Sequence, residues 1–183
     1  MGGLKIGSKA ASSLEINKGI SNVLKVGGKF RFECFDKDGK LKWVSESKNT
    51  VTNEGLLYLL DQVFGAAAKV TQWYVGLYTA TVGAHADLTG ADIGGANLTE
   101  FTGYSGTRKT FDGARIGYTW ANSGSQAQFP ITSNATIKGA FLASDDAGTA
   151  DYLLCIDGFD AGDRAVAPSD TLKVSYVFSV QTL

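Results

Sequence analysis

The stretch that decides the fold is residues 29–43, KFRFECFDKDGKLKW. Charged and apolar side chains alternate from Lys29 to Cys34, and a period of two predicts a half-buried β-strand. Asp38 and Gly39 follow, and Asp-Gly is a strong signal for a tight hairpin turn. Residues 41–45 then run back as a second strand. The sequence therefore predicts an antiparallel hairpin near the start of the folded part of the chain.

Further strand-like runs follow this hairpin, separated by clusters of Gly, Asp, Asn and Ser. They cover residues 70–78, 115–120, 126–131, 136–142, 152–156 and 172–180. Pro130 cannot donate a backbone hydrogen bond, so we expect it on an edge strand or at a bulge. Short β-rich runs with such turns are typical of sandwiches and partly closed barrels. We predict a mainly β fold, a single antiparallel β-sandwich that is jelly-roll-like.

One short helix is predicted after residue 51. Thr52 or Asn53 can cap it, and Glu54 suits its positive end. Gly65 is placed to end it in a left-handed conformation. Gly55 in the first turn costs about 1 kcal/mol relative to alanine, so tertiary packing must hold the helix. Apolar residues recur at helical spacing, and we expect this stripe to face the core: Leu56, Leu59, Leu60, Val63 and Phe64.

The 183 residues suffice for one core, since a chain of this size buries roughly 70% of its unfolded surface. We predict a β-sandwich domain over residues 23–183, preceded by an extended, flexible N-terminal arm over residues 1–22. The arm is rich in Gly and Ser and carries more Lys than acid. It is either a solvated terminus or a basic tail that orders on a partner. Its candidate contact residues are Leu4, Lys5, Ile6, Lys9 and Lys18.

Reactive residues are scarce. Cys34 and Cys155 each lie among apolar strand residues, so we expect free, buried thiols, and the absence of a signal-peptide pattern favours a reducing compartment. His85 is the only histidine. One histidine and two distant cysteines supply neither a zinc site nor a nucleophile-histidine pair. The sequence therefore predicts no catalytic residue, no metal and no cofactor, and we expect His85 in a surface loop.

Other kinds of site have weaker support. The acids between Asp145 and Asp170 stand in turns, where Asp bonds the local backbone, so a calcium site or a glycosidase acid pair is not favoured. Aromatic residues of the kind that stack on sugars stand at strand positions that would bury them: Trp43, Trp73, Tyr104 and Trp120. Lys+Arg 17 against Asp+Glu 18 argues against a nucleic-acid binder, and no apolar run is long enough for a membrane span.

Residues 86–100 repeat the pattern Ala-Asp/Asn-apolar at intervals of five. The pattern is like that of a pentapeptide-repeat β-helix, but 15 residues are too few to bury a core of their own. We interpret the segment as a long loop. Long loops on rigid β scaffolds often form contact surfaces, so residues 80–107, with His85, are a candidate partner contact.

A family resemblance rests on the order of several motifs, which none of the site arguments uses. They are residues 29–43, 49–61, 73–77, 100–105, Arg108, 139–142 and 170–174. In this order they resemble small virion structural proteins of tailed bacteriophages, from about Lys29 to the C-terminus. The resemblance implies a head-decoration (cement) protein: a non-enzymatic β-sandwich on the capsid exterior that binds neighbouring major capsid subunits, commonly as a homotrimer. It would assemble in the cytoplasm of the bacterial host.

Two other functions stay open from the sequence. One is a neck, tail or fibre component that binds a virion partner or a host-surface glycan through residues 80–107. The other is a small hydrolase on a β-sandwich, which would require two strongly perturbed carboxylates in one cleft.

Overall fold

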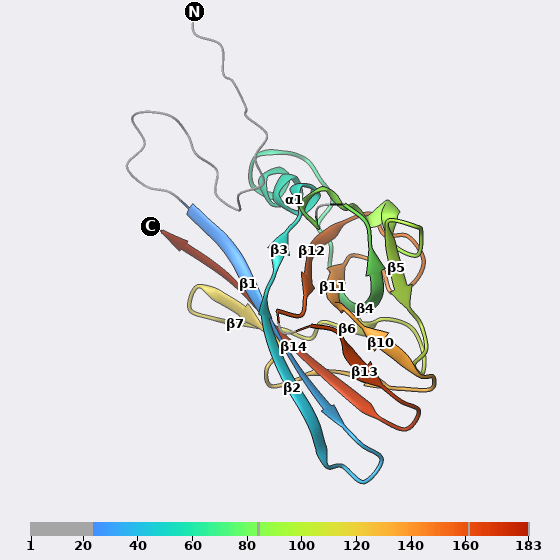
Figure 1. Cartoon of the computed structure of the whole chain (residues 1–183). Helices are drawn as coiled ribbons and strands as arrows, with labels where there is room; N and C mark the ends of the chain where they lie inside the picture. Colours follow the sequence, from blue (N-terminus) through green and yellow to red (C-terminus); the bar gives the residue numbers. More distant parts are fainter. Residues whose placement is uncertain (1–23, 84, 161, 183) are drawn as a thin grey trace, which may run out of the picture.

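The computed structural model describes residues 24–83, 85–160 and 162–182. The predicted arm, residues 1–22, lies outside the described residues, together with Leu4, Lys5, Ile6, Lys9 and Lys18. The described part is an antiparallel β-sandwich with one α-helix, as the sequence predicted (Figure 1). No helix within these ranges has the length and apolar character needed to cross a membrane.

The first sheet has the order β2-β1-β14-β8-β7. Strand β9 pairs with β14 along the same edge as β8, at residues 171–174 of β14. Its strands are β1 (Leu24–Phe35), β2 (Leu41–Lys48), β7 (Ala114–Ile116), β8 (Thr119–Ala121), β9 (Ala127–Pro130) and β14 (Thr171–Thr182). The hairpin predicted from residues 29–43 is β1 and β2. Its turn is held by Asp36, whose Oδ1 accepts from the backbone N–H of Asp38 and of Lys40, both at 2.9 Å.

The second sheet has the order β3-β12-β11-β4-β5, and β6 pairs with β4. Its strands are β3 (Thr50–Val51), β4 (Tyr74–Thr81), β5 (Leu98–Phe101), β6 (Lys109–Thr110), β11 (Gly139–Ala143) and β12 (Leu153–Gly158). A small sheet pairs β10 (Ala135–Ile137) with β13 (Arg164–Val166). Helix α1 (Asn53–Phe64) follows β3 and lies at one end of the second sheet (Figure 1).

Strands β1 and β14 are the long central pair of the first sheet. They pair over their whole length, from Leu24 opposite Thr182 to Phe35 opposite Thr171. Pro130 ends β9, which pairs only with β14 among the named strands, so the prediction of an edge position is confirmed. The long β1–β14 ladder brings the two ends of the described chain together.

The main core lies between the two sheets. Many of its large, fully buried members come from alternate positions of facing strands, among them Phe30, Phe32, Val75, Leu77, Phe129, Leu142, Leu172, Val174 and Tyr176. Each large apolar side chain buried in this way stabilises the fold by about 1.5–3 kcal/mol. Successive residues of a strand point to opposite faces, so the second sheet has a further apolar face to cover.

That opposite face is covered by the segment with the five-residue repeat. It contains two short 3₁₀ helices, η1 (His85–Asp87) and η2 (Gly90–Asp92). Its apolar residues Leu88, Ile93 and Leu98, spaced by five, are buried in a second cluster with Phe141 and Ile156. The predicted loop is therefore a packed part of the core, which is a use of the repeat that the sequence analysis missed.

Two local predictions were wrong. Residues 115–120 are two strands, β7 and β8, because Gly117 takes φ +60° and reverses the chain between them. Gly65 does end α1, but with φ −104° and ψ −162°, which is extended and not left-handed. The cap prediction is confirmed, since Thr52 Oγ1 accepts from the backbone N–H of Gly55 at 2.9 Å.

Candidate protein-binding surfaces

Helix α1 lies on β12 through a face centred on Gly55 and Tyr58. A Cβ placed on Gly55 would stand 2.3 Å from the backbone oxygen of Leu154, so only glycine permits this close approach. Tyr58 is buried against Trp73 and Tyr152, with ring centroids 5.4 and 4.6 Å away. Its hydroxyl accepts from the backbone N–H of Val70 at 2.8 Å. Within the described part of the chain, the helix therefore packs on the body through one side.

Glu54 ties the first turn of α1 to two other elements. Its Oε2 accepts from the backbone N–H of Gly90 at 2.8 Å and of Leu153 at 2.6 Å. Asn53 donates from its side-chain nitrogen to Asp87 Oδ1 at 2.9 Å. These contacts join α1 to η1, η2 and β12, so the orientation of the helix is set by hydrogen bonds as well as by packing.

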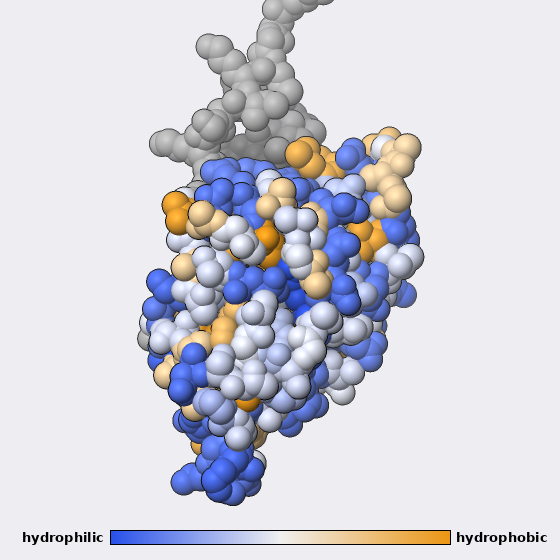
Figure 2. Space-filling view, turned by 90° about the vertical axis from the view of Figure 1, so that its right-hand side faces the viewer, coloured by the Kyte–Doolittle hydropathy of each residue, from blue (hydrophilic) through white to orange (hydrophobic). Residues whose placement is uncertain are grey.

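The opposite side of α1 is apolar and exposed. We call it the helix face, and it consists of Leu57, Leu60, Val63 and Phe64. The exposed fractions of these side chains run from 50% for Leu60 to 85% for Phe64. Figure 2 shows hydrophobic residues near the top of the molecule, at the height of α1 in Figure 1. The prediction that Leu60, Val63 and Phe64 face the core is wrong, because the close contact at Gly55 turns a different side toward β12.

A second apolar surface lies at the hairpin of β7 and β8. We call it the hairpin tip, and it consists of Ile116, Tyr118 and Trp120, whose exposed fractions are 66%, 88% and 46%. Trp120 lies opposite Arg115 in the ladder and shares a face of the ribbon with it, whereas Ile116 lies on the other face and Tyr118 stands in the turn. Gly117 with positive φ precedes Tyr118 in a two-residue turn, a favoured geometry for hairpins. Thr119 Oγ1 donates to the carbonyl of Ile116 at 2.7 Å. The aromatic side chains are thus held on a well-formed turn.

The four aromatic residues considered for sugar binding lie in different environments. Tyr104 is buried, and Trp73 packs on Tyr58. Trp43 packs edge-on against Phe159 and donates from Nε1 to the carbonyl of Ala165 at 3.2 Å. Only Trp120 departs from the expected core position. The structure therefore does not bring these side chains together as one platform.

His85 begins η1 in the connection between β4 and β5, within the predicted loop, and is half-buried there. Its Nε2 lies 3.2 Å from Thr81 Oγ1, and its ring meets the edge of Tyr78 at a centroid distance of 6.1 Å. Burial lowers the pKa of His85. Its role in partner binding stays a prediction.

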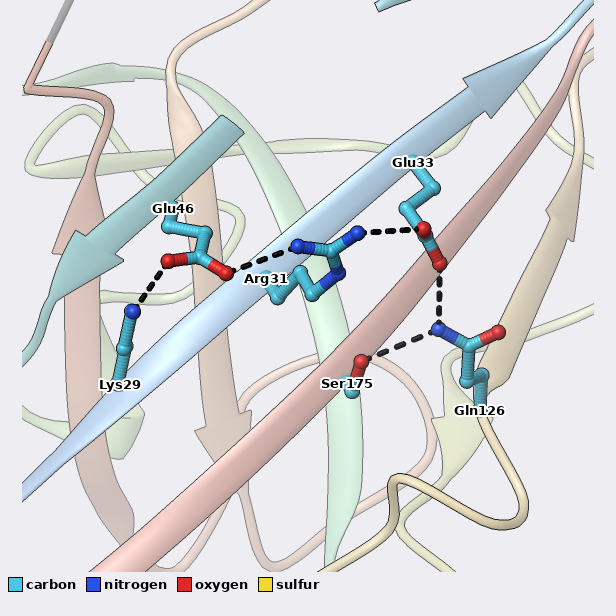
Figure 3. A network of polar contacts seen from close by, with 6 residues as sticks. All are labelled: Lys29, Arg31, Glu33, Glu46, Gln126 and Ser175. Carbon is cyan, nitrogen blue, oxygen red and sulfur yellow. Dashed lines mark hydrogen bonds and ion pairs between the residues drawn. The ribbon is translucent and has the colours of Figure 1, made fainter. Parts of the chain in front are cut away.

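The outer face of the first sheet carries a chain of polar contacts. Arg31 donates to Glu46 at 2.9 Å and to Glu33 at 2.8 Å. Hydrogen bonds from Gln126 and Arg31 lower the pKa of Glu33, and hydrogen bonds from Lys29 and Arg31 lower the pKa of Glu46. Two cations and two carboxylates balance each other within this network, and exposed pairs of this kind contribute little to stability. The same face also carries Lys48, opposite Lys29, and Lys173, opposite Glu33, so the face is polar with an excess of positive charge. Figure 3 shows the full network: Lys29, Arg31, Glu33, Glu46, Gln126 and Ser175.

One carboxyl group is buried between the sheets. Asp157 is 2% exposed and accepts from the hydroxyl of Ser47. Burial raises its pKa to about 7, and the charge of Asp160 acts in the same direction. Nearby, Asn49 donates to the hydroxyl of Tyr176 at 2.9 Å. Asp157 is the only described carboxyl whose pKa is resolved as raised, and at 2% exposed it is not open to a substrate.

The loop between β11 and β12 uses its acids for its own structure. Asp145 Oδ2 accepts from Ser144 Oγ at 2.5 Å and from the backbone N–H of Asp151 at 2.9 Å. Within the described ranges, no three His, Cys, Asp or Glu side chains gather closely enough to hold a metal ion. The turn interpretation of Asp145 is thus supported by its hydrogen bonds.

Comparison with known proteins adds no further constraint. No protein-family model, no curated protein and no solved structure matches this chain.

Proposed function

We propose that this chain is a non-enzymatic structural protein of a tailed-bacteriophage virion. In this proposal it decorates the capsid exterior by binding neighbouring major capsid subunits. The support is of two kinds, the order of motifs in the sequence and the surface of the folded body. The order of motifs indicates a class of protein, and the surface of the folded body indicates how such a protein would bind its partners.

The observation that carries the proposal is the pair of exposed apolar surfaces on a well-packed body. Monomeric soluble proteins rarely expose contiguous large apolar patches unless these serve in binding. The helix face and the hairpin tip both stand on elements fixed by hydrogen bonds. Aromatic residues such as Tyr118 and Trp120 are enriched where protein interfaces bind most strongly. The body thus has the properties of a protein that works by contact with other proteins.

The test is a count of copies in purified virions of the phage that encodes the chain. Quantitative mass spectrometry against the major capsid protein should give hundreds of copies per particle. Recombinant protein added to shells that lack it should bind until the same ratio is reached. A count in the tens or fewer, with binding to arrayed host glycans, would contradict decoration and favour the tail or fibre function.

A further inference from the structure

We propose that the hairpin tip of one copy of this chain docks on the helix face of a second copy. The contact would be head-to-tail, because each copy contributes a different surface. Seven of the eleven large apolar residues that are exposed in the described part of the chain belong to these two surfaces. They are therefore the two main concentrations of apolar side chains that the fold leaves uncovered, and a second copy can cover both.

The distribution of apolar residues on α1 indicates that a partner covers its outer side. Its inner side buries Tyr58 and its outer side exposes Leu57, Leu60 and Phe64, so α1 is apolar on two opposite sides. A helix that is apolar all round is typically buried all round. Among the described residues only one side is covered, by β12 and the residues around it. The outer side is thus suited to a layer that the described part of the chain does not supply.

The hairpin tip of a second copy has a shape that can cover the outer side of α1. Two strands joined by a tight turn present Ile116 and Tyr118 at the end of a narrow ribbon. Strand β7 is the edge of its sheet, and all three of its residues are exposed. The face of this ribbon that carries Trp120 and Arg115, with Tyr118 at its end, can lie on an apolar helical stripe, whereas Ile116 lies on the opposite face.

Charges beside the two surfaces are opposite. Asp61 is exposed and lies four residues after Leu57 and three before Phe64, at the border of the helix face. Arg115 is exposed in β7 and stands opposite Trp120 in the β7–β8 ladder, at the border of the hairpin tip. Neither side chain has a salt-bridge partner among the described residues. An arginine and an aspartate at matching borders would fix the orientation of the contact.

These features favour a second copy over a foreign partner, since one chain carries both halves of an apolar and charge-matched contact. Head-to-tail contacts close into rings when the rotation between copies allows it. The contact joins copies of this chain through the same two surfaces that support the proposed function, so it rests on the view that these surfaces serve in protein binding.

The first experiment measures self-association of the purified full-length chain by sedimentation velocity over a range of concentrations. The variants Tyr118→Asp and Phe64→Asp place a charge at the most exposed position of each surface. Each should weaken association by at least about tenfold, because a charge would be buried without a partner. The control is Val82→Asp, since Val82 is 62% exposed and belongs to neither surface. Circular dichroism and the melting temperature should stay at the wild-type values in all three variants.

Mixing separates a head-to-tail contact from a symmetric one. Tyr118→Asp keeps its helix face and Phe64→Asp keeps its hairpin tip, so an equimolar mixture should form heterodimers although neither variant associates alone. In the same way, Asp61→Lys and Arg115→Glu should each weaken association, and their mixture should recover part of it.

Three results would overturn the proposal. One is a wild-type chain that stays monomeric throughout the concentration range. Another is association that survives in both Tyr118→Asp and Phe64→Asp, or that is lost only when residues 1–23 are deleted. The third is a mixture of the two variants that contains no heterodimer while each variant alone is folded. Capsid occupancy is measured separately, so failure of the decoration function is distinguishable from each of these results.

Discussion

Arg108 forms a two-bond ion pair with Glu100 inside the protein, with Nε to Oε1 at 2.7 Å and Nη2 to Oε2 at 2.8 Å. The side chain of Arg108 has no solvent exposure. Its guanidinium also donates to the carbonyls of Asp145, at 2.8 Å, and Gly148, and lies 5.3 Å from the centroid of the Phe141 ring. One side chain therefore joins β5, the segment before β6 and the loop after β11.

Replacing Arg108 should destabilise the fold strongly. In Arg108→Met the carboxylate of Glu100 stays buried without its partner, and such losses amount to about 3–5 kcal/mol. Arg108→Lys should also be destabilised, because lysine cannot form the paired bonds and reach both carbonyls. Urea unfolding gives the free energies. The control is Arg31→Met, which breaks exposed pairs and should change stability far less than either Arg108 variant. Equal losses at the two positions would contradict the structural role of Arg108.

Gly55→Ala separates helix propensity from packing. In an exposed helix, alanine would stabilise by about 1 kcal/mol relative to glycine. Here the new Cβ would meet the backbone oxygen of Leu154 at 2.3 Å, so the helix or β12 must move. We expect a net loss of about 1–3 kcal/mol in thermal or urea unfolding. Gly27→Ala is the control, because a Cβ there has nothing within 4 Å. A Gly55→Ala variant more stable than the wild type would show that α1 lies farther from β12.

The two thiols should resist modification in the folded protein. Burial raises the pKa of Cys34 to about 11 and that of Cys155 to about 12. The thiolate is the reactive form, so at pH 8 both side chains are hidden and protonated. A thiol reagent such as Ellman's should give no rapid reaction with the native protein and two equivalents in urea. Rapid labelling of the native chain at either position would contradict the burial of that thiol.

Much of the fold is visible in local sequence patterns, because each pattern has a local cause. Alternation of side chains gives the β1–β2 hairpin, Asp-Gly gives its turn, and Thr52 gives the helix cap. The order of the strands has no such cause. The pairing of β1 with β14 joins segments separated by more than a hundred residues, and it depends on which faces bury each other.

The candidate surfaces show why an apolar pattern alone is ambiguous. Helix α1 carries large apolar residues around most of its circumference, so its hydrophobic spacing fits more than one orientation. The useful signal was Gly55, since a glycine kept inside a helix marks a close approach of another element. At the hairpin, Gly117 in the middle of an apolar run was the signal for a turn, and it exposes Tyr118.

The buried carboxyl of Asp157 predicts an unusual dependence of stability on pH. Burial raises its pKa in the folded protein to about 7, whereas an unfolded chain has an aspartate pKa of about 3.9. Between these values the folded protein keeps a proton that the unfolded chain has lost. The contribution of Asp157 to stability is therefore most favourable below pH 4, decreases as the pH rises from 4 to 7, and is least favourable above 7. Cys155 and Tyr176 nearby stay protonated throughout, because burial raises both pKa values.

Asp157→Asn tests this directly, because asparagine is nearly isosteric, has no charge and can still accept from Ser47. A difference of about three pKa units corresponds to about 4 kcal/mol, and relaxation around the group makes about 2–4 kcal/mol a reasonable range. The variant should match the wild type at pH 4 and become more stable by that amount above pH 7. Other acids with lowered pKa values titrate in both proteins, so the difference between the two urea-unfolding curves isolates Asp157. The control is Asp112→Asn, on an exposed side chain, which should leave the pH profile unchanged. If the Asp157→Asn difference were the same at every pH, the carboxyl would not be held protonated between the sheets.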